Sequence, residues 1–145
     1  MITTTDPDLL PAEPGAYLLM LHLDRAIALP PRFKGLQLPK GRYAYAGSAY
    51  GSGGIRARCR RHLLQSGVRH WHVDWLSHAA SEVRAAAFPG NIECALINQL
   101  SGLSGVRFPV PGFGSTDCRQ CPSHLMRIDG CHRVDDIATH LGLGR

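Results

Sequence analysis

Strands are predicted where apolar residues run without a break or alternate with small and polar ones. Residues 16 to 23 (AYLLMLHL) are apolar on both faces of an extended chain, which is typical of a central strand. Residues 42 to 47 (RYAYAG) predict a second strand, and because side chains alternate along a strand, Tyr43 and Tyr45 share one face. Two further extended segments are expected at 82 to 88 (EVRAAAF) and 124 to 128 (HLMRI).

Apolar residues recur at helical spacing in other segments. Ile55, Cys59 and Leu63 form one stripe at about 100° per residue, which predicts a helix from residue 55 to about 64. Asn91 is expected to cap the start of a helix over 92 to 100 (IECALINQL). Two more helices are expected over 70 to 78 (HWHVDWLSH) and through Val134, Ile137, Ala138 and Leu141.

The order of these elements indicates the fold class. Strands come first, then helices, then a strand and a helix, which predicts an α+β fold with a small, mostly antiparallel sheet of three to four strands flanked by helices. The 145 residues fit one domain spanning 1 to 145. No apolar run approaches the roughly 18 residues that cross a bilayer, and residues 1 to 15 lack a signal-peptide pattern. We therefore expect a cytoplasmic protein with no membrane partner.

Positive charge is concentrated in arginine. The formal net charge is +5, and all but two of the 16 basic residues, Lys34 and Lys40, are arginine. A guanidinium group binds phosphate through parallel hydrogen bonds, so this bias suits a polyanionic partner such as a nucleic acid. A GC-rich genome, which also enriches Ala and Gly, produces the same bias without any function. The placement of the arginines therefore has to separate the two explanations.

Four arginines lie close together on the helix predicted from residue 55, at positions 56, 58, 60 and 61. Such a cluster repels itself unless a polyanion neutralises it. Arg58 and His62 are four residues apart, so they share one helix face and can reach the same phosphate. Arg56 and Arg60 line the other border of the apolar stripe. The alternative is a solvated basic helix that binds nothing.

Glu93 stands where an apolar residue is expected. On a helical wheel it lies between Ile97 and Leu100, in the middle of the apolar face of its helix. A carboxylate that faces the interior costs several kcal/mol unless it is paired, hydrogen-bonded or bound to a metal ion. Glu93 is therefore a candidate metal ligand or, alternatively, the partner of a buried arginine near the start of its helix.

The cysteines suggest thiols or metal ligands. There are five, an odd number that argues against a disulfide framework. Cys118, Cys121 and His124 form a C-x2-C-x2-H pattern, which is part of a zinc signature. Two alternatives stay open: a pair of buried thiols, and a segment 115 to 124 that folds over the tyrosines and adds Asp117 or His124 to their site.

A histidine-rich stretch follows the basic helix. His70 lies one helical turn before Asp74, and the neighbouring Trp71 and Trp75 are expected in the core. His70 is a candidate phosphate contact or proton-transfer group, or else a structural histidine that is paired within the fold.

Several of these residues occur in an order that resembles a known family. Gly15-Ala16-Tyr17, Tyr45-Ala46-Gly47, the helix residues Arg58 and His62, and a later Glu93 follow the pattern of the GIY-YIG nuclease superfamily. The resemblance covers a core of about residues 15 to 100 and leaves about 104 to 145 as a C-terminal extension. The stretches HWHVDWL and GFGSTDC...CPSHL resemble an uncharacterised branch of that superfamily, sometimes appended to an endonuclease III. For that branch the resemblance extends over nearly the whole chain.

The resemblance implies roles for these residues. Glu93 would bind one Mg²⁺ or Mn²⁺, because hard cations prefer oxygen ligands. One of Tyr17 and Tyr45, its pKa lowered by the metal or by Arg58, would orient or deprotonate the attacking water. Arg58 would hold the scissile phosphate, and His62 would contact an oxygen or assist a proton transfer.

The implied activity is metal-dependent hydrolysis of DNA phosphodiester bonds, in DNA repair and with a repair protein as a further partner. The residues expected to contact the DNA backbone on either side are Arg56, Arg60, Arg61, Arg69 and His70. Two alternatives stay open: a nucleic-acid-binding module that keeps the scaffold and does not cut, and a structural protein in which zinc or the thiols matter most.

Overall fold

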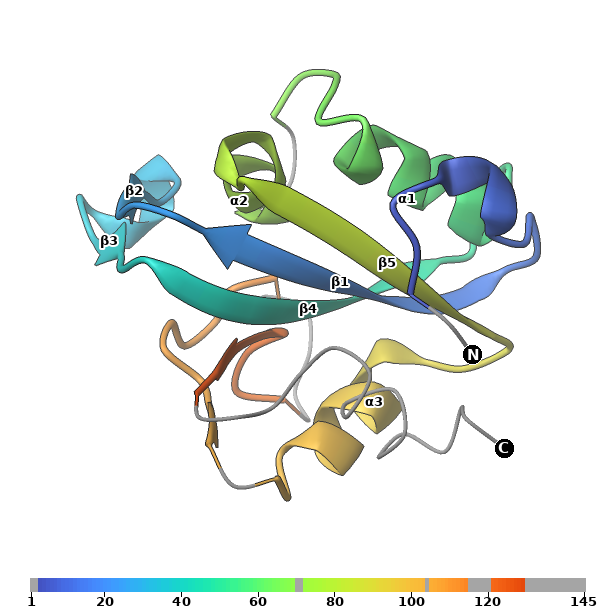
Figure 1. Ribbon diagram of the computed structural model, residues 1–145. Helices are drawn as coiled ribbons and strands as arrows, with labels where there is room; N and C mark the ends of the chain where they lie inside the picture. The colour runs from blue at the N-terminus through green and yellow to red at the C-terminus, as the bar shows by residue number, and fades with distance from the viewer. Residues whose placement is uncertain (1–2, 70–71, 104, 115–120, 130–145) are drawn as a thin grey trace.

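A five-stranded antiparallel sheet forms the centre of the fold (Figure 1). The structure, a computed structural model, describes residues 3–69, 72–103, 105–114 and 121–129. The strands, in the order β5-β1-β4-β7-β6, are β1 (Gly15–Leu23), β4 (Gly41–Ala49), β5 (Glu82–Pro89), β6 (Val106–Arg107) and β7 (Leu125–Ile128). The predicted α+β class is confirmed. The sheet exceeds the three to four strands expected because the C-terminal extension contributes both β7 and the short β6.

β1 lies between β4 and β5, as its doubly apolar sequence predicted. In the two pairings Tyr17 lies opposite Gly47 of β4 and Ala87 of β5. Every residue of β1 except His22 is buried. Alternate side chains enter two separate cores, with Tyr17 and Leu19 on one face of the sheet and Leu18 on the other. Burial on both faces explains why apolar residues occupy nearly every position of this strand.

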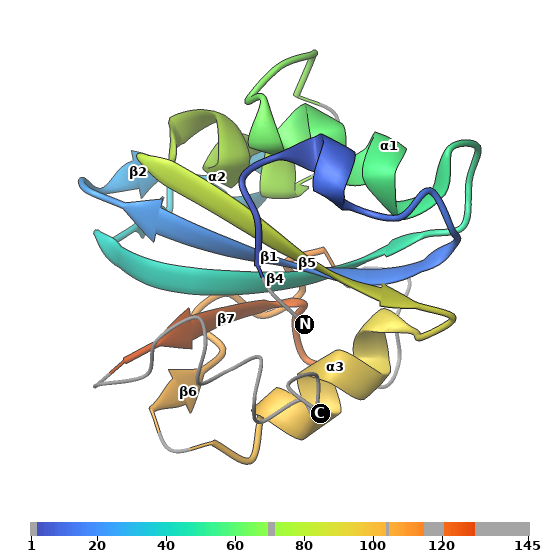
Figure 2. The same cartoon turned by 45° about the vertical axis from the view of Figure 1, so that its right-hand side comes forward.

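Helices cover both faces of the sheet (Figures 1 and 2). α1 (Gly54–Leu63) and α2 (His72–Ala79) pack on the face that carries the tyrosines, whereas α3 (Glu93–Leu100) packs on the opposite face. The predicted stripe on α1 is confirmed, since Ile55 and Cys59 are buried and Leu63 packs against the same core. None of the helices in the described part of the chain is long and apolar enough to cross a membrane.

Short elements complete the tyrosine face. Between β1 and β4 the chain forms a two-stranded sheet of β2 (Ile27–Ala28) and β3 (Gln37–Leu38) around a 3-10 helix, η2 (Pro31–Phe33). Another 3-10 helix, η1 (Pro7–Leu9), precedes β1 and lies beside α1. Phe33 stacks against Phe113 with ring centres 5.7 Å apart. These segments therefore enlarge the core on the side of α1 and α2.

The predicted cap at Asn91 is wrong. Ile92, whose side chain has no hydrogen-bonding group, occupies the N-cap position of α3. Asn91 lies in the turn after β5, where its backbone N–H donates to the carbonyl of Phe88 (3.1 Å) and its carbonyl accepts a hydrogen bond from the Tyr50 hydroxyl (2.7 Å). The turn therefore overrides the capping preference of asparagine. The predicted last helix, through Val134 to Leu141, lies outside the described residues.

The Tyr17 ring lies directly against the backbone of Gly47. A β-carbon at position 47 would lie 2.3 Å from Cζ and 2.4 Å from the hydroxyl oxygen of Tyr17. Non-bonded carbon atoms at optimal separation are about 3.5–4.0 Å apart. Only glycine therefore leaves room for the ring at this point of the sheet.

Gly47→Ala is expected to destabilise the protein by about 1–3 kcal/mol, because overpacking forces the Tyr17 ring or β4 to move. Gly51→Ala is the matched control, since a β-carbon at Gly51 meets no heavy atom within 4 Å. Equilibrium unfolding in urea measures both variants. Equal loss of stability in the two would contradict the close contact.

Candidate active site

Tyr17 and Tyr45 form the centre of the candidate site. They belong to neighbouring strands, β1 and β4, and their side chains enter the core on the face of α1 and α2. Tyr17 is 2% exposed and Tyr45 is 7% exposed. The charge of Arg58 acts on both hydroxyl groups, and the charge of Glu93 acts on that of Tyr45. The charges that act on the Tyr45 hydroxyl thus include those of two further residues that the sequence pattern singled out, Arg58 and Glu93.

Burial controls the protonation of the two tyrosines. It raises the pKa of both above the usual value, and the charge of Glu93 adds to the rise at Tyr45. Arg58 acts to lower the pKa of each tyrosine, but its effect is smaller than that of burial. Arg58 therefore acts in the expected direction, but burial outweighs it and the pKa of both tyrosines stays above the usual value. At neutral pH both side chains are neutral hydroxyl groups.

Arg58 borders a small groove beside α1. The groove has a volume of about 150 Å³ and is lined by Arg58, Arg61, Ala49, Ala57 and the glycine-rich loop at 51–54. The backbone N–H groups of Ile55 and Arg56, in the first turn of α1, already donate to the carbonyls of Glu13 and Pro11 (both 2.9 Å). A phosphate in this groove would therefore be held by the arginine side chains and not by the helix N-terminus.

Glu93 is the first residue of α3 and is half-buried. Ile97 and Leu100, the two residues that flank it on the helical wheel, are both buried, so the prediction that Glu93 lies on the inward side of its helix agrees with the structure. Its charge acts on Tyr45 and on His124. The carboxylate therefore acts electrostatically on one residue of the tyrosine pair and on one of the C-terminal extension.

His62 is buried and does not lie on the surface beside Arg58. It is 1% exposed, and its Nδ1 lies 3.1 Å from Ser77 Oγ and 3.5 Å from Asp74 Oδ1 of α2. Burial lowers the pKa of His62, and this effect exceeds the opposing one of Asp74. Its ring centre lies 6.3 Å from that of Tyr17. The expectation that His62 and Arg58 contact one phosphate does not fit this position; His62 instead joins α1 to α2 next to Tyr17.

Asp74 is a buried carboxylate that the sequence patterns did not assign to the site. It is 0% exposed, and its Oδ2 accepts a hydrogen bond from Arg61 at 2.9 Å. Arg61 also donates to the carbonyl of Val68 (2.9 Å). The expected contact of Arg61 with DNA therefore competes with an internal ion pair. The sequence signals were its position one helical turn after His70 and its place between Val73 and Trp75, two residues that face the core.

The other arginines of α1 contact the N-terminal segment. Arg56 Nε donates to the carbonyl of Leu10 at 2.7 Å. Arg60 Nη1 lies 3.3 Å from Asp8 Oδ1 in an exposed pair. Both side chains thus contact the segment around η1, which lies along the border of α1 opposite to Arg58. Contact of Arg56 and Arg60 with DNA would therefore require the DNA backbone to reach this border of the helix.

Arg69 lies outside α1 and packs on a tryptophan. Its guanidinium carbon lies 4.9 Å from the centre of the Trp75 ring. Trp75 is partly buried against the core, as expected for it. The other members of this stretch with a predicted role, His70 and Trp71, lie outside the described residues.

A loop of the C-terminal extension covers Tyr45. The rings of Phe113 and Tyr45 meet edge to face with their centres 6.1 Å apart. A β-carbon at Gly114 would lie 2.7 Å from Cε1 of Tyr45, so glycine is needed here too. The residues directly before the segment 115 to 124 thus lie over Tyr45, and the alternative in which that segment itself covers the tyrosines stays a prediction. The residues 115–120, with Asp117, lie outside the described part of the chain.

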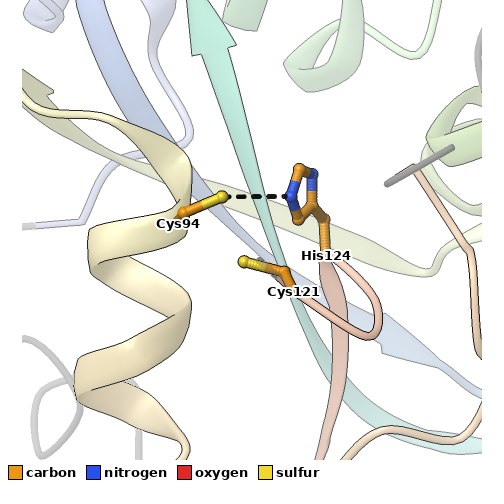
Figure 3. A group of neighbouring side chains, drawn as sticks. All are labelled: Cys94, Cys121 and His124. Carbon is orange, nitrogen blue, oxygen red and sulfur yellow. Dashed lines mark hydrogen bonds between the residues drawn. The ribbon is translucent and has the colours of Figure 1, made fainter. Parts of the chain in front are cut away.

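Cys94, which follows Glu93 in the chain, forms a second group of candidate ligands with Cys121 and His124 (Figure 3). The ligand atoms of Cys94, Cys121 and His124 all lie within 4.8 Å of one another, and Cys94 Sγ is 3.8 Å from Nε2 of His124. Two of the three predicted zinc ligands are therefore together, while Cys118 lies outside the described residues. Sequence reasoning missed Cys94 because zinc signatures depend on local spacing, and this cysteine is on a helix far from the pair along the chain.

The family model described as "Domain of unknown function DUF123" matches residues 16–142, which include the tyrosine site and the Cys94 cluster. The chain belongs to the DUF123 family. No curated protein and no solved structure matches it. DUF123 membership therefore covers both the core and the C-terminal extension, and the function has to be argued from the geometry of the site.

The buried His62 predicts a dependence of stability on pH. Because its folded-state pKa is lower than that of an unfolded histidine, the unfolded chain binds the proton first, and stability is lost as the pH falls below about 6.5. His62→Gln should reduce this loss by up to about 1.4 kcal/mol per pH unit. Urea unfolding from about pH 8 to about pH 5 measures it.

His22→Gln is the matched control for this experiment, since His22 is the exposed residue of β1. The control should retain the pH dependence of the wild-type protein. A wild-type slope in His62→Gln as well would show that His62 is not the buried group that resists protonation.

Proposed function

We propose that this protein is a metal-dependent endonuclease of the GIY-YIG type that hydrolyses phosphodiester bonds in DNA. One observation carries the proposal: the charges of an arginine from α1 and a carboxylate from α3 both act on the hydroxyl of Tyr45. Tyr45 is one of two tyrosines that lie on adjacent strands and on the same face of the sheet. Tyr17, Tyr45, Arg58 and Glu93 come from four separate elements. Residues this far apart in the chain converge for a reaction more readily than for stability alone, because burying them costs free energy.

Arg58 is the residue proposed to bind the scissile phosphate. It lines the groove beside α1, next to the loop at 51–54 and close enough to both tyrosines to shift their pKa values. A guanidinium group offers several N–H donors in a planar fork and keeps its charge at any relevant pH. Charge that develops on the phosphoryl oxygens would be stabilised by this group without reorganisation of solvent.

The tyrosines are proposed to orient the attacking water as neutral groups. Since burial raises the pKa of Tyr17 and Tyr45, their hydroxyls keep the proton and both donate and accept hydrogen bonds. A hydroxyl that accepts a hydrogen bond from the attacking water orients that water, so that a lone pair of the water oxygen points toward the phosphorus. Gly47 and Gly114 leave room for the two rings, and the close contact of each ring with the glycine backbone fixes where the hydroxyl lies.

Glu93 fits a hard divalent cation. It is a single half-buried carboxylate with access to solvent, and Mg²⁺ and Mn²⁺ are commonly bound through one or two carboxylates while they keep several waters. When bound, such an ion supplies charge neutralisation at the phosphoryl oxygens and lowers the pKa of coordinated water. The contribution of the chain is to hold this carboxylate where its charge acts on the Tyr45 hydroxyl.

His62 is proposed as a positioning residue. With Ser77 and Asp74 it ties α1 to α2 in a dry environment, and its ring lies next to that of Tyr17. Asp74 in turn fixes Arg61, three residues after Arg58 on the same helix. This buried polar group therefore sets the rotation of α1, and with it the direction in which Arg58 points.

Glu93→Gln is expected to lower DNA cleavage by at least about 100-fold, because the substitution removes the charge that binds the cation. Labelled single-stranded, duplex, flapped and branched DNA, each with and without Mg²⁺ or Mn²⁺, identifies the preferred substrate. Glu82→Gln is the matched control, since Glu82 is an exposed carboxylate at the far end of β5. It should retain wild-type cleavage.

Two results would contradict the proposal. Cleavage that survives unchanged in Glu93→Gln would belong to another site or to a contaminant. No cleavage of any substrate by the wild-type protein, together with binding that weakens steeply with salt, would favour a binding module on the same scaffold. In that case Glu93→Gln and the wild-type protein should bind DNA equally.

A further inference from the structure

Three ligand atoms converge between α3 and the segment that leads into β7. Figure 3 shows Cys94 on the first turn of α3 and Cys121 and His124 on the opposing segment, with both sulfur atoms and the imidazole directed toward one another. Around a tetrahedral zinc ion, Zn–S bonds near 2.3 Å and Zn–N bonds near 2.0 Å place sulfur and nitrogen about 3.5 Å apart. The observed distance from Cys94 Sγ to His124 Nε2 is 3.8 Å. This pair therefore needs only a small contraction, and the other two pairs, which lie within 4.8 Å, need to approach by about 1 Å at most to share one ion.

The donor types select the metal. Thiolate and imidazole groups favour Zn²⁺ over Mg²⁺ or Mn²⁺, which prefer carboxylate, carbonyl and water oxygens. Cys94 and Cys121 thus differ in chemistry from Glu93, which directly precedes Cys94 in the chain. Two neighbouring side chains at the start of α3 therefore suit two different classes of ion.

The segment that carries His124 is held in place by backbone hydrogen bonds. The N–H of His124 donates to the carbonyl of Phe113 (2.9 Å), and that of Gly112 donates to the carbonyl of Pro122 (2.7 Å). The His124 side chain also has a hydrogen bond with the backbone of Gly114. Zinc-binding histidines commonly use their second ring nitrogen in this way, which fixes the orientation of the ring.

An ion can reach the cluster from solvent. Among the described residues, Cys94 and Cys121 both line a groove of about 580 Å³ between α3 and the C-terminal extension. His124 is 4% exposed and closes the inner side of the cluster. The cluster therefore combines a rigid inner ligand with two thiols on an open groove, an arrangement in which a metal can bind after the protein has folded.

We propose that Cys94, Cys121 and His124 bind one Zn²⁺ ion that ties the start of α3 to the segment that leads into β7. Unlike the local pattern of Cys118, Cys121 and His124, this site joins two parts of the chain that are distant in sequence, and Cys118 lies outside the described residues. A fourth donor, either water or another side chain, completes the tetrahedron.

The zinc ion would also position the carboxylate of the proposed nuclease, an inference that rests on the proposed function. His124 accepts a hydrogen bond from the N–H of Ala46 (3.0 Å), and the next residue, Leu125, pairs with Tyr45. A metal bridge from His124 to Cys94 thus connects the strand of Tyr45 to the helix turn of Glu93. Loss of the bridge would leave only the apolar packing of α3 on β4 to hold the helix turn of Glu93 near the strand of Tyr45.

Zinc binding by the purified full-length chain tests the proposal. We expect one zinc per chain after dialysis, measured by elemental analysis. We expect Cys94→Ser, Cys121→Ser and His124→Gln to bind zinc at least about 100-fold more weakly, because even loss of a supporting hydrogen bond costs a metal site about 10–100-fold. Cys59→Ala is the matched control, since Cys59 is buried on the other face of the sheet and should leave the zinc affinity unchanged.

A second measurement uses only the wild-type protein, in case a variant fails to fold. Zinc should protect Cys94 and Cys121 from alkylation, as read by peptide mass spectrometry, and a chelator should expose both while the buried Cys59 stays unreactive. Co²⁺ in place of zinc should give the visible absorption of a tetrahedral site with thiolate ligands. Equal alkylation with and without zinc, an unchanged zinc affinity in Cys94→Ser, or a disulfide between Cys94 and Cys121 would each overturn the proposal.

The readouts separate this proposal from the nuclease proposal. Zinc content and thiol protection are measured without DNA, so they stand even if no DNA is cut. If cleavage occurs, Cys94→Ser should reduce it while Glu93→Gln abolishes it without loss of zinc. Loss of zinc in Glu93→Gln would instead make Glu93 a fourth zinc ligand and overturn the division between the two ions.

Discussion

The contact between the Tyr17 ring and the backbone of Gly47 is the constraint on which this face of the sheet depends. The ring occupies the space that any side chain at position 47 would need, so β1 and β4 pair with Tyr17 opposite Gly47 and with Tyr45 nearby on the same face. A slip of one residue in this pairing would turn the side chains of one strand to the opposite face, toward α3. The face of the sheet on which α1 packs, and near which Arg58 lies, is therefore set by this pairing.

The polar groups between the sheet, α1 and α2 are organised by burial more than by charge. Burial raises the pKa of Tyr17 and Tyr45 and lowers that of His62, in each case against the effect of a nearby opposite charge. The groups therefore tend toward their neutral forms, and hydrogen bonds such as that between His62 and Ser77 become the means of fixing them. Arg61 and Asp74 form the charged exception, at the margin of the helix pair.

The start of α3 brings two kinds of donor group together. Glu93 acts electrostatically on Tyr45, whereas Cys94 faces Cys121 and His124. Hard oxygen and soft sulfur donors differ in the ions they select, so adjacent residues can serve separate purposes without competing for one metal. The C-terminal extension takes part in both, because its loop covers the Tyr45 ring and its last described strand pairs with β4.

The amino-acid sequence by itself determined the long strands, α1, the apolar stripe with Ile55 and Cys59, and the shared face of Tyr43 and Tyr45, because these depend on periodicity within one element. It also indicated Tyr17, Tyr45, Arg58 and Glu93 as candidate site residues, because they occur along the chain in the order of a known family. Only the tertiary structure decided that His62 is buried, that Asp74 pairs with Arg61, that Asn91 belongs to a turn, and that Cys94 completes the cysteine and histidine cluster. Each of these depends on which surface of a neighbouring element a side chain meets, and that is set by packing between distant segments rather than by local spacing.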